Sequence, residues 1–350
     1  MALDLDDARV RYHFAFTRED HERLPLYSAL LRSLENDPDA LALLAGVRVE
    51  QRNPMLILAS LHLAALRGHR VLAPIYSSAR QGTMSNIDAA VREVLGVIHD
   101  DPELVRHELH RSTQTNEPGR CAVFQAVVAQ IARRYPSINL IDVGTSAGIN
   151  LYFDRFRVRE SDDGEALTLV CHDETEVDRS LPLPEVVSRV GIDPSPLDLD
   201  HEDDRLWLEA CLWPEEPRRM ARLEAVVAAR ATWPTSTILK GTAAQRLNDA
   251  VALGNPASLT VVVNSYVAGY FAVNEQLAYF EEMSERCLNE NVAWLSLESP
   301  FMVKWPKVPA SGSAMPAGAT QILVTLPGGS PTEWGWCHHH GKWLVLHAPF

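Results

Sequence analysis

The stretch Asn139-Leu-Ile-Asp-Val-Gly-Thr-Ser-Ala-Gly-Ile-Asn-Leu151 decides the fold class of this chain. A short apolar run ends in an acid and a turn of small residues, and an apolar-periodic segment follows. That order predicts a buried strand, a tight turn and the start of a helix. Such a turn directs backbone N–H groups and the positive end of a helix toward a ligand.

Strand-like and helical runs alternate after this stretch. Further strands are predicted at residues 189–193, 237–241, 259–264 and 292–297, with helices between them. This alternation indicates an α/β fold with a Rossmann-like, mostly parallel sheet. Residues 321–326 and 342–347 predict a C-terminal antiparallel hairpin, joined through residues 334–341.

The part of the chain before this sheet reads as helical. Asn53 and Pro54 cap a predicted helix over residues 55–66, which is apolar almost all round and therefore buried. His62 within it is expected to be a hydrogen-bonded core histidine. Residues 74–86 are rich in Ser, Gly and Gln and predict a loop. We expect two parts, an all-helical N-terminal domain over residues 1–118 and an α/β domain over residues 119–350.

Composition limits the classes of function. The formal net charge of −14 and the absence of a Lys/Arg run argue against a protein that grips nucleic acid. The five cysteines are odd in number and scattered, which favours a reducing cytoplasm over a disulfide framework. The acidic start of the chain does not resemble a signal peptide, and no apolar run reaches transmembrane length. The chain therefore indicates a cytoplasmic protein that acts on a small molecule, and it leaves the oligomeric state open.

The run Cys337-His-His-His340 invites interpretation as a metal site. Alternation along a strand would place only two of these side chains on one face, whereas zinc sites use three or four ligands. A hairpin tip that turns at Gly341 is the better interpretation, and we expect no metal here.

A polar loop, Gln114-Thr-Asn-Glu-Pro-Gly-Arg120, precedes the helix that leads into the opening strand. Alone, it would be a solvated helix entry. If the turn after Asp142 binds a ligand, however, the start of this helix lies beside that ligand. Gln114, Asn116, Glu117 and Arg120 are then candidate substrate-binding residues.

Several segments together resemble an uncharacterised bacterial family catalogued as domain of unknown function 2332. They are Val49-Glu-Gln-Arg-Asn-Pro54, the loop from Gln114 to Arg120, the stretch from Asp142 to Leu151, Gly191-Ile-Asp-Pro-Ser-Pro-Leu-Asp198 and His340-Gly-Lys-Trp343. That resemblance spans nearly the whole chain and implies no reaction.

The α/β part, from about residue 119 to residue 347, also resembles methyltransferases that use S-adenosylmethionine. The resemblance implies a methyltransferase-type sheet, this cofactor, and a transferase activity. Its expected cofactor-binding residues are Asp142, Gly144, Thr145, Ser146 and Gly148 in the loop, Asp193 on the ribose hydroxyls, and Thr242 at the adenine. Asn264 and Tyr266 fall where such enzymes meet the methyl group and the acceptor, and are the expected catalytic residues.

This sequence departs from the methyltransferase pattern in three ways. Ser146 replaces the usual middle glycine of the loop, and Thr242 replaces the acid at the adenine. Asp193 also follows Asp142 at a long distance, so residues 157–188 must be an insertion. If the strand predicted at residues 167–171 is instead the second strand, Asp173 becomes the ribose acid.

Two other functions remain open. Gly144-x-Ser146-x-Gly148 matches the nucleophile elbow of α/β-hydrolases, with His347 or the group His338–His340 as the base. Against this interpretation, the part before the elbow reads as helical and has no oxyanion loop. The third possibility is a non-catalytic binding protein that keeps the fold.

Overall fold

The computed structural model describes residues 23–44, 47, 52–175, 181–306, 308 and 315–347. Contacts divide the chain into two compact units, one of Met1–Thr115 with Leu197–Val227 and one of Asn116–Pro196 with Ala228–Phe350. We expected one boundary after residue 118. Instead, Leu197–Val227 joins the helical unit, because its side chains, such as Trp207, are part of the core of that unit.

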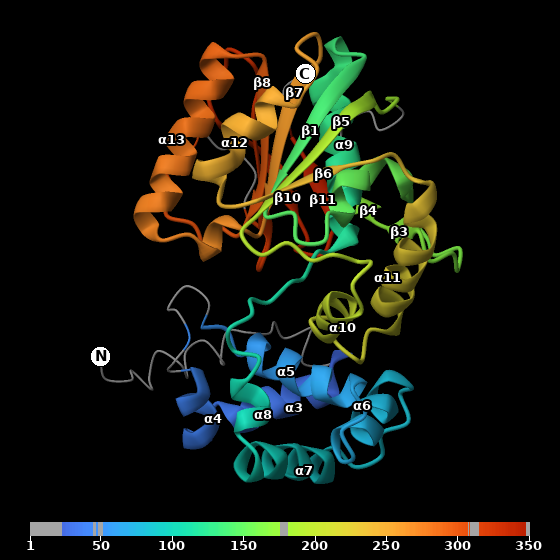
Figure 1. Ribbon diagram of the computed structural model, residues 1–350. Coiled ribbons are helices and arrows are strands. Elements are labelled where there is room, and N and C mark those ends of the chain that lie inside the picture. The colour runs from blue at the N-terminus through green and yellow to red at the C-terminus, as the bar shows by residue number, and fades with distance from the viewer. Residues whose placement is uncertain are drawn as a thin grey trace. The chain divides into compact units, whose positions relative to one another are not determined.

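The first unit is helical throughout its described part (Figure 1). Its helices are α3 (Pro25–Leu34), α4 (Pro38–Leu43), α5 (Met55–Leu66), α6 (Leu72–Arg80), α7 (Ile87–Asp100), α8 (Glu103–Arg106), α10 (Glu202–Ala210) and α11 (Pro217–Ala229), whose last two residues belong to the second unit.

Helix α5 is the centre of this unit. Nearly every side chain along it is buried, as its uniform apolarity predicts. The Asn53 side chain accepts a hydrogen bond from the Met55 N–H, 2.9 Å, at its start. His62 Nδ1 lies 3.2 Å from the carbonyl oxygen of Ala210 and 3.0 Å from that of Leu212, and burial lowers its pKa to about 4. His62 is thus a neutral, hydrogen-bonded core histidine, as expected.

Helix α6 occupies much of the segment for which the sequence predicted a loop. Pro74 is its third residue. The first N–H groups of a helix have no intrahelical acceptor, so proline costs little there. The loop prediction for residues 74–80 was therefore wrong, because these residues continue the helix that begins at Leu72.

The second unit is built on a nine-stranded sheet in the order β4-β11-β10-β9-β8-β7-β1-β5-β6. Its strands are β1 (Ser137–Val143), β4 (His172–Asp173), β5 (Glu185–Asp193), β6 (Thr237–Lys240), β7 (Leu259–Ser265), β8 (Val292–Glu298), β9 (Thr320–Thr325), β10 (Thr332–Cys337) and β11 (Trp343–Leu346). Strands β6, β5, β1, β7 and β8 are mutually parallel, and β8 to β11 are antiparallel neighbours. The expected fold class, a mostly parallel α/β sheet with antiparallel C-terminal strands and helices before it, is confirmed.

Helices cover both faces of this sheet (Figure 1). Helices α12 (Ala243–Ala252) and α13 (Val273–Asn289) pack on the face that carries Ile141, Val262 and Trp294. Helix α9 (Cys121–Ile131) lies on the other face and is buried along almost its whole length. Both faces of the central strands are therefore covered by helices.

Two sequence predictions about the remaining strands change. Residues 332–337 form strand β10, where we expected only a connection, because five of these six residues are buried and show no alternation. Residues 168–170 form β3, which pairs with β2 (Arg157–Arg159) in a separate two-stranded sheet. Asp173 lies on β4 at the far edge of the main sheet, so Asp193 and not Asp173 ends the strand beside β1.

Candidate functional site

The sequential order of the parallel strands reverses next to β1. The parallel strands β6, β5, β1, β7 and β8 are the third, second, first, fourth and fifth of this set along the chain. In open α/β sheets of this order, ligands bind beyond the carboxyl ends of the strands where the order reverses. That point lies between β1 and β7, where Val143 is in register with Asn264.

The turn after β1 is held in an unusual backbone conformation. Gly144, Ser146 and Gly148 have positive φ values of 78°, 55° and 74°. The N–H groups of Gly144 and Thr145 donate to the Ile192 carbonyl, at 2.8 and 3.2 Å, which fastens the turn to β5. The next element, Ile149–Arg155, is a 3₁₀ segment kinked at Tyr152. The α-helix expected here is absent, and no helix dipole of useful length points at the turn.

Asp193 closes the turn from the end of β5. Its Oδ2 accepts a hydrogen bond from the Ser146 N–H, 2.9 Å, and its Oδ1 accepts one from the Ser195 N–H, 2.8 Å. Burial raises its pKa, and these two hydrogen bonds oppose the rise. In this state Asp193 braces the loop through both oxygens, each of which keeps a lone pair for a further donor.

Asp142 lies at the end of β1 and is buried. Its Oδ2 has no hydrogen bond of ordinary geometry with the described residues. Burial raises its pKa to about 7, the Asp193 charge adds to the rise, and the Thr145 hydroxyl and Arg120 oppose it. The Ser146 hydroxyl oxygen is also buried without a partner among the described residues, and the Thr145 hydroxyl makes no hydrogen bond of ordinary geometry there. Polar groups with unmet capacity therefore gather at this turn.

Two glycines at this edge pack against protein. A Cβ built on Gly144 in the turn would lie 2.5 Å from Val267 Cγ2, and one on Gly191 of β5 would lie 2.5 Å from Thr145 Cγ2. Gly144 was a predicted cofactor-binding residue. In this conformation Val267, in the turn after β7, fills the space above Gly144.

Asn264 at the end of β7 is fully buried. Its Nδ2 donates to Ser296 Oγ, 2.9 Å, and Glu298 Oε1, 2.8 Å, and its Oδ1 accepts from the Tyr279 hydroxyl, 3.3 Å, and Trp294 Nε1, 2.7 Å. This occupies the hydrogen-bonding capacity of the carboxamide. Asn264 is placed to support Glu298, and contact with an acceptor would require it to give up a partner.

Arg120 and Tyr266 lie together at the same end of the sheet. The Arg120 guanidinium stacks 4.5 Å from the centre of the Tyr266 ring and donates to the Ser265 carbonyl and hydroxyl oxygens, 3.1 and 3.0 Å. The Tyr266 hydroxyl is hydrogen-bonded to Thr320 Oγ1, 2.6 Å, and burial raises its pKa to about 12. Tyr266 therefore stays protonated at neutral pH, and it has a strained positive φ of 56°.

The polar loop before α9 reaches the turn, as the sequence predicted. Asn116 Oδ1 accepts a hydrogen bond from the Ile149 N–H, 3.2 Å, with a φ of 32° at Asn116. Glu117 Oε1 accepts from the Gly119 N–H, 2.8 Å, and its Oε2 lies 3.2 Å from His340 Nδ1. Gln114, by contrast, belongs to the helical unit, where its N–H donates to Cys211 Sγ.

Two other candidates have local structural roles. Thr242 is the N-cap of α12, and its N–H donates to the Gln245 side chain, 3.0 Å. His340 faces Glu117, and Ser146 Oγ contacts no histidine among the described residues. The hydrolase arrangement thus lacks its nucleophile–base hydrogen bond in this state.

Glu298 is the residue that sequence reasoning missed. It ends β8, is 2% exposed, and lies on the same end of the sheet as Asp142 and Asn264. Its signal was the one used for Asp142 and Asp193, an acid that directly follows a buried strand. The predicted strand stopped at residue 297, one residue short of it.

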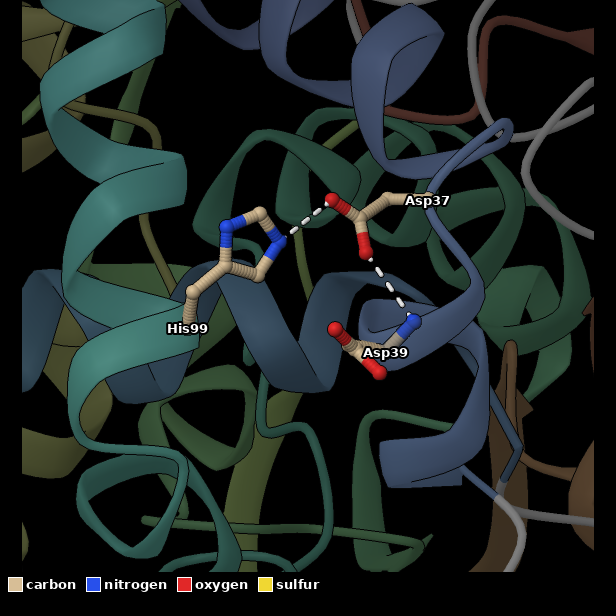
Figure 2. A group of neighbouring side chains, drawn as sticks. All are labelled: Asp37, Asp39 and His99. Atoms are coloured by element: carbon tan, nitrogen blue, oxygen red, sulfur yellow. Dashed lines mark hydrogen bonds and ion pairs between the residues drawn. The ribbon is translucent and has the colours of Figure 1, made fainter.

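A separate group of potential metal ligands lies in the helical unit. Figure 2 shows Asp37, Asp39 and His99, whose ligand atoms lie within 4.8 Å of one another. His99 Nε2 contacts Asp37 Oδ2 at 2.7 Å, and Asp37 Oδ1 accepts the N–H groups of Asp39 and Ala40 as the cap of α4. Helix capping and the hydrogen bond between His99 and Asp37 account for this arrangement.

Comparison with known proteins gives the family. No helix in the described part of the chain combines the length and the apolarity that a membrane span requires. No curated protein and no solved structure matches the sequence. The model of a family of uncharacterised proteins conserved in bacteria, DUF2332, matches residues 11–345. The chain therefore belongs to the bacterial DUF2332 family.

Proposed function

We propose that the carboxyl ends of β1, β5 and β7 bind S-adenosylmethionine, and that the protein methylates a small-molecule acceptor. One observation carries the proposal. Asn116, Ser146 and Tyr266 are the non-glycine residues with positive φ in the described part of the chain, and all three border the point where the strand order reverses. Strained backbone of this kind concentrates at ligand sites, where the surrounding structure over-determines it.

The polar groups at this edge suit such a ligand. Asp142 Oδ2 and the hydroxyls of Thr145 and Ser146 are buried and have capacity to spare, which an ammonium group and ribose hydroxyls can use. Asp193 holds the loop and retains acceptor capacity toward the ribose. Since Val267 fills the space above Gly144, we propose that it moves when the cofactor binds.

Methyl transfer from this cofactor needs little acid–base catalysis by the protein. The cofactor supplies an electrophilic methyl group on a sulfonium, and the protein must align the acceptor and exclude water. Arg120 and Thr320 fix Tyr266 in position for that task. We propose Tyr266 as the residue that contacts the acceptor and Asn264 as the support beneath it.

Charge and cysteine state bear on the acceptor and the compartment. The net charge of −14 supports a small acceptor over a nucleic acid. None of the five cysteines, all within the described residues, forms a disulfide bond, which supports our proposal of a cytoplasmic protein.

A thermal-shift titration of the full chain with S-adenosylmethionine and S-adenosylhomocysteine tests cofactor binding, with adenosine as the control. We expect both to raise the melting temperature at concentrations where adenosine does not. No rise with either compound would refute the proposal. Binding without methylation of any amine, hydroxyl or carboxylate acceptor in a radiolabelled screen would favour the non-catalytic alternative.

One observation favours a second candidate, a serine hydrolase. Ser146 has the strained, left-handed backbone that a nucleophile elbow uses. Labelling with a fluorophosphonate tests this directly. Labelling that is lost in Ser146→Ala would establish the hydrolase, and we expect no labelling, because no histidine contacts Ser146 Oγ among the described residues.

A further inference from the structure

Glu298 is a buried carboxylate that is satisfied at only one oxygen. Its Oε1 accepts three hydrogen bonds, from Asn264 Nδ2 at 2.8 Å and from the N–H groups of Val267 and Ala268 at 3.0 and 3.1 Å. Its Oε2 is buried and has no partner among the described residues. The carboxylate is thus fixed in orientation, with one oxygen left for another group.

No described cation neutralises this carboxylate. Arg120 influences Glu298 and Asp142 electrostatically, yet its N–H groups go to the oxygens of Ser265 and His339. Neither Glu298 nor Asp142 forms an ion pair within the described residues. Burial raises the pKa of both acids, and the Arg120 charge opposes the rise without forming an ion pair to either acid.

Apart from Arg120, the groups that act on Glu298 are neutral. Asn264 and the Val267–Ala268 backbone donate to it, and Tyr266 and Tyr279 interact with it electrostatically. A buried charge without a partner is costly, and a ligand that brings the opposite charge recovers that cost. This arrangement favours a cation over an anion or a neutral ligand.

We propose that the acceptor bound at this edge carries a protonated amine, and that Glu298 Oε2 receives it. The inference rests on the proposed function, because it names the chemical class of the acceptor for that site. Asp142 lies at the end of β1 and Glu298 at the end of β8, so two acids on either side of β7 give the site its preference for positive charge. An ordered water on Oε2 is the competing explanation.

Thermal shift of the full chain saturated with S-adenosylhomocysteine tests the inference, with 1-propylammonium chloride and 1-propanol as probes at matched ionic strength. The variants are Glu298→Gln and, as the matched control, Glu285→Gln, which makes the same change at an exposed position on α13. We expect propylammonium, but not propanol, to raise the melting temperature of the wild type and of Glu285→Gln. The rise should be lost in Glu298→Gln.

An equal rise in the wild type and in Glu298→Gln would overturn the inference. So would no rise with propylammonium in a wild type that responds to S-adenosylhomocysteine, since water would then account for Oε2. No response to S-adenosylhomocysteine itself refutes the proposed function instead; a propylammonium response that depends on Glu298 would still support the cation site. If Glu298→Gln does not fold, the carboxyl signal of ¹³C-labelled Glu298 in the wild type must shift with propylammonium and not with propanol.

Discussion

Val267 lies over Gly144, so close that a Cβ built on Gly144 would be 2.5 Å from Val267 Cγ2. This contact joins the turn after β1 to the turn after β7, across the point where the strand order reverses. Glu298 holds the second turn through the N–H groups of Val267 and Ala268. The proposed cofactor site is therefore closed by the protein's own side chain until a ligand displaces it.

Gly144→Ala should destabilise the protein more than Gly164→Ala. Both glycines have φ near +80°, but Gly164 has open space where a Cβ would be placed, whereas Gly144 meets Val267. The conformational cost is shared, about 1 kcal/mol, and the overpacking adds roughly 1–3 kcal/mol at Gly144. Urea unfolding of both variants measures the difference. Equal losses of stability would show that the contact with Val267 is easily relieved.

Val267→Ala should tighten binding of S-adenosylhomocysteine. Displacing a smaller side chain from Gly144 loses less packing, on the order of 1 kcal/mol, or about fivefold in affinity. Isothermal titration calorimetry measures this, with Val273→Ala, an exposed valine on α13, as the control. Unchanged or weaker binding would mean that Val267 does not occupy the place of the cofactor.

Asp142→Asn should change how stability depends on pH. Because burial raises the pKa of Asp142 from 3.8 to about 7, the folded state keeps a proton that the unfolded chain releases. The wild type therefore loses stability, relative to the variant, as pH rises from about 4 to about 7, by a few kcal/mol at most. Unfolding curves at several pH values test this. A constant difference between the two proteins would show that folding does not shift the pKa of Asp142.

Asp193→Asn should loosen the turn after β1 and weaken binding of the cofactor. A carboxamide has one acceptor oxygen, so it cannot accept from both the Ser146 and the Ser195 N–H groups, and one bond of about 1–3 kcal/mol is lost. We expect at least about tenfold weaker binding of S-adenosylhomocysteine. Asp249→Asn on α12 is the control for loss of an exposed acid.

Tyr266→Phe should leave cofactor binding intact. If Tyr266→Phe weakened cofactor binding and Asp193→Asn did not, the roles proposed for Asp193 and Tyr266 would be wrong.

The sheet was predictable because its signals are local. An apolar run that ends in an acid marked β1 and β5, and the same signal would have marked Glu298 if β8 had been extended by one residue. Strand β10 was missed because it is buried on both faces, so no alternation shows in its sequence. Helix α6 was missed because residues 74–86 are rich in Ser, Gly and Gln and were taken as a loop, although proline at residue 74 is tolerated in a first turn.

The hydrogen-bond partners of buried side chains could not be predicted from the sequence, because they join residues that are distant in the chain. Asn264 was predicted to meet the acceptor, and its position at a strand end was right. Its hydrogen-bond partners Ser296, Glu298 and Trp294 lie on β8, and Tyr279 lies on α13. No local sequence pattern predicts these hydrogen bonds. The discontinuous helical unit is hidden for the same reason: Trp207 looks like any other buried residue until its neighbours are known.

A crystal structure of the protein with S-adenosylhomocysteine tests the central claim most directly. The account predicts density for an adenosyl ligand beyond the carboxyl ends of β1 and β5, beside Asp142 and Asp193, with Val267 moved away from Gly144. Density for the ligand at another place, or none at saturating concentration with Val267 still packed on Gly144, would contradict it.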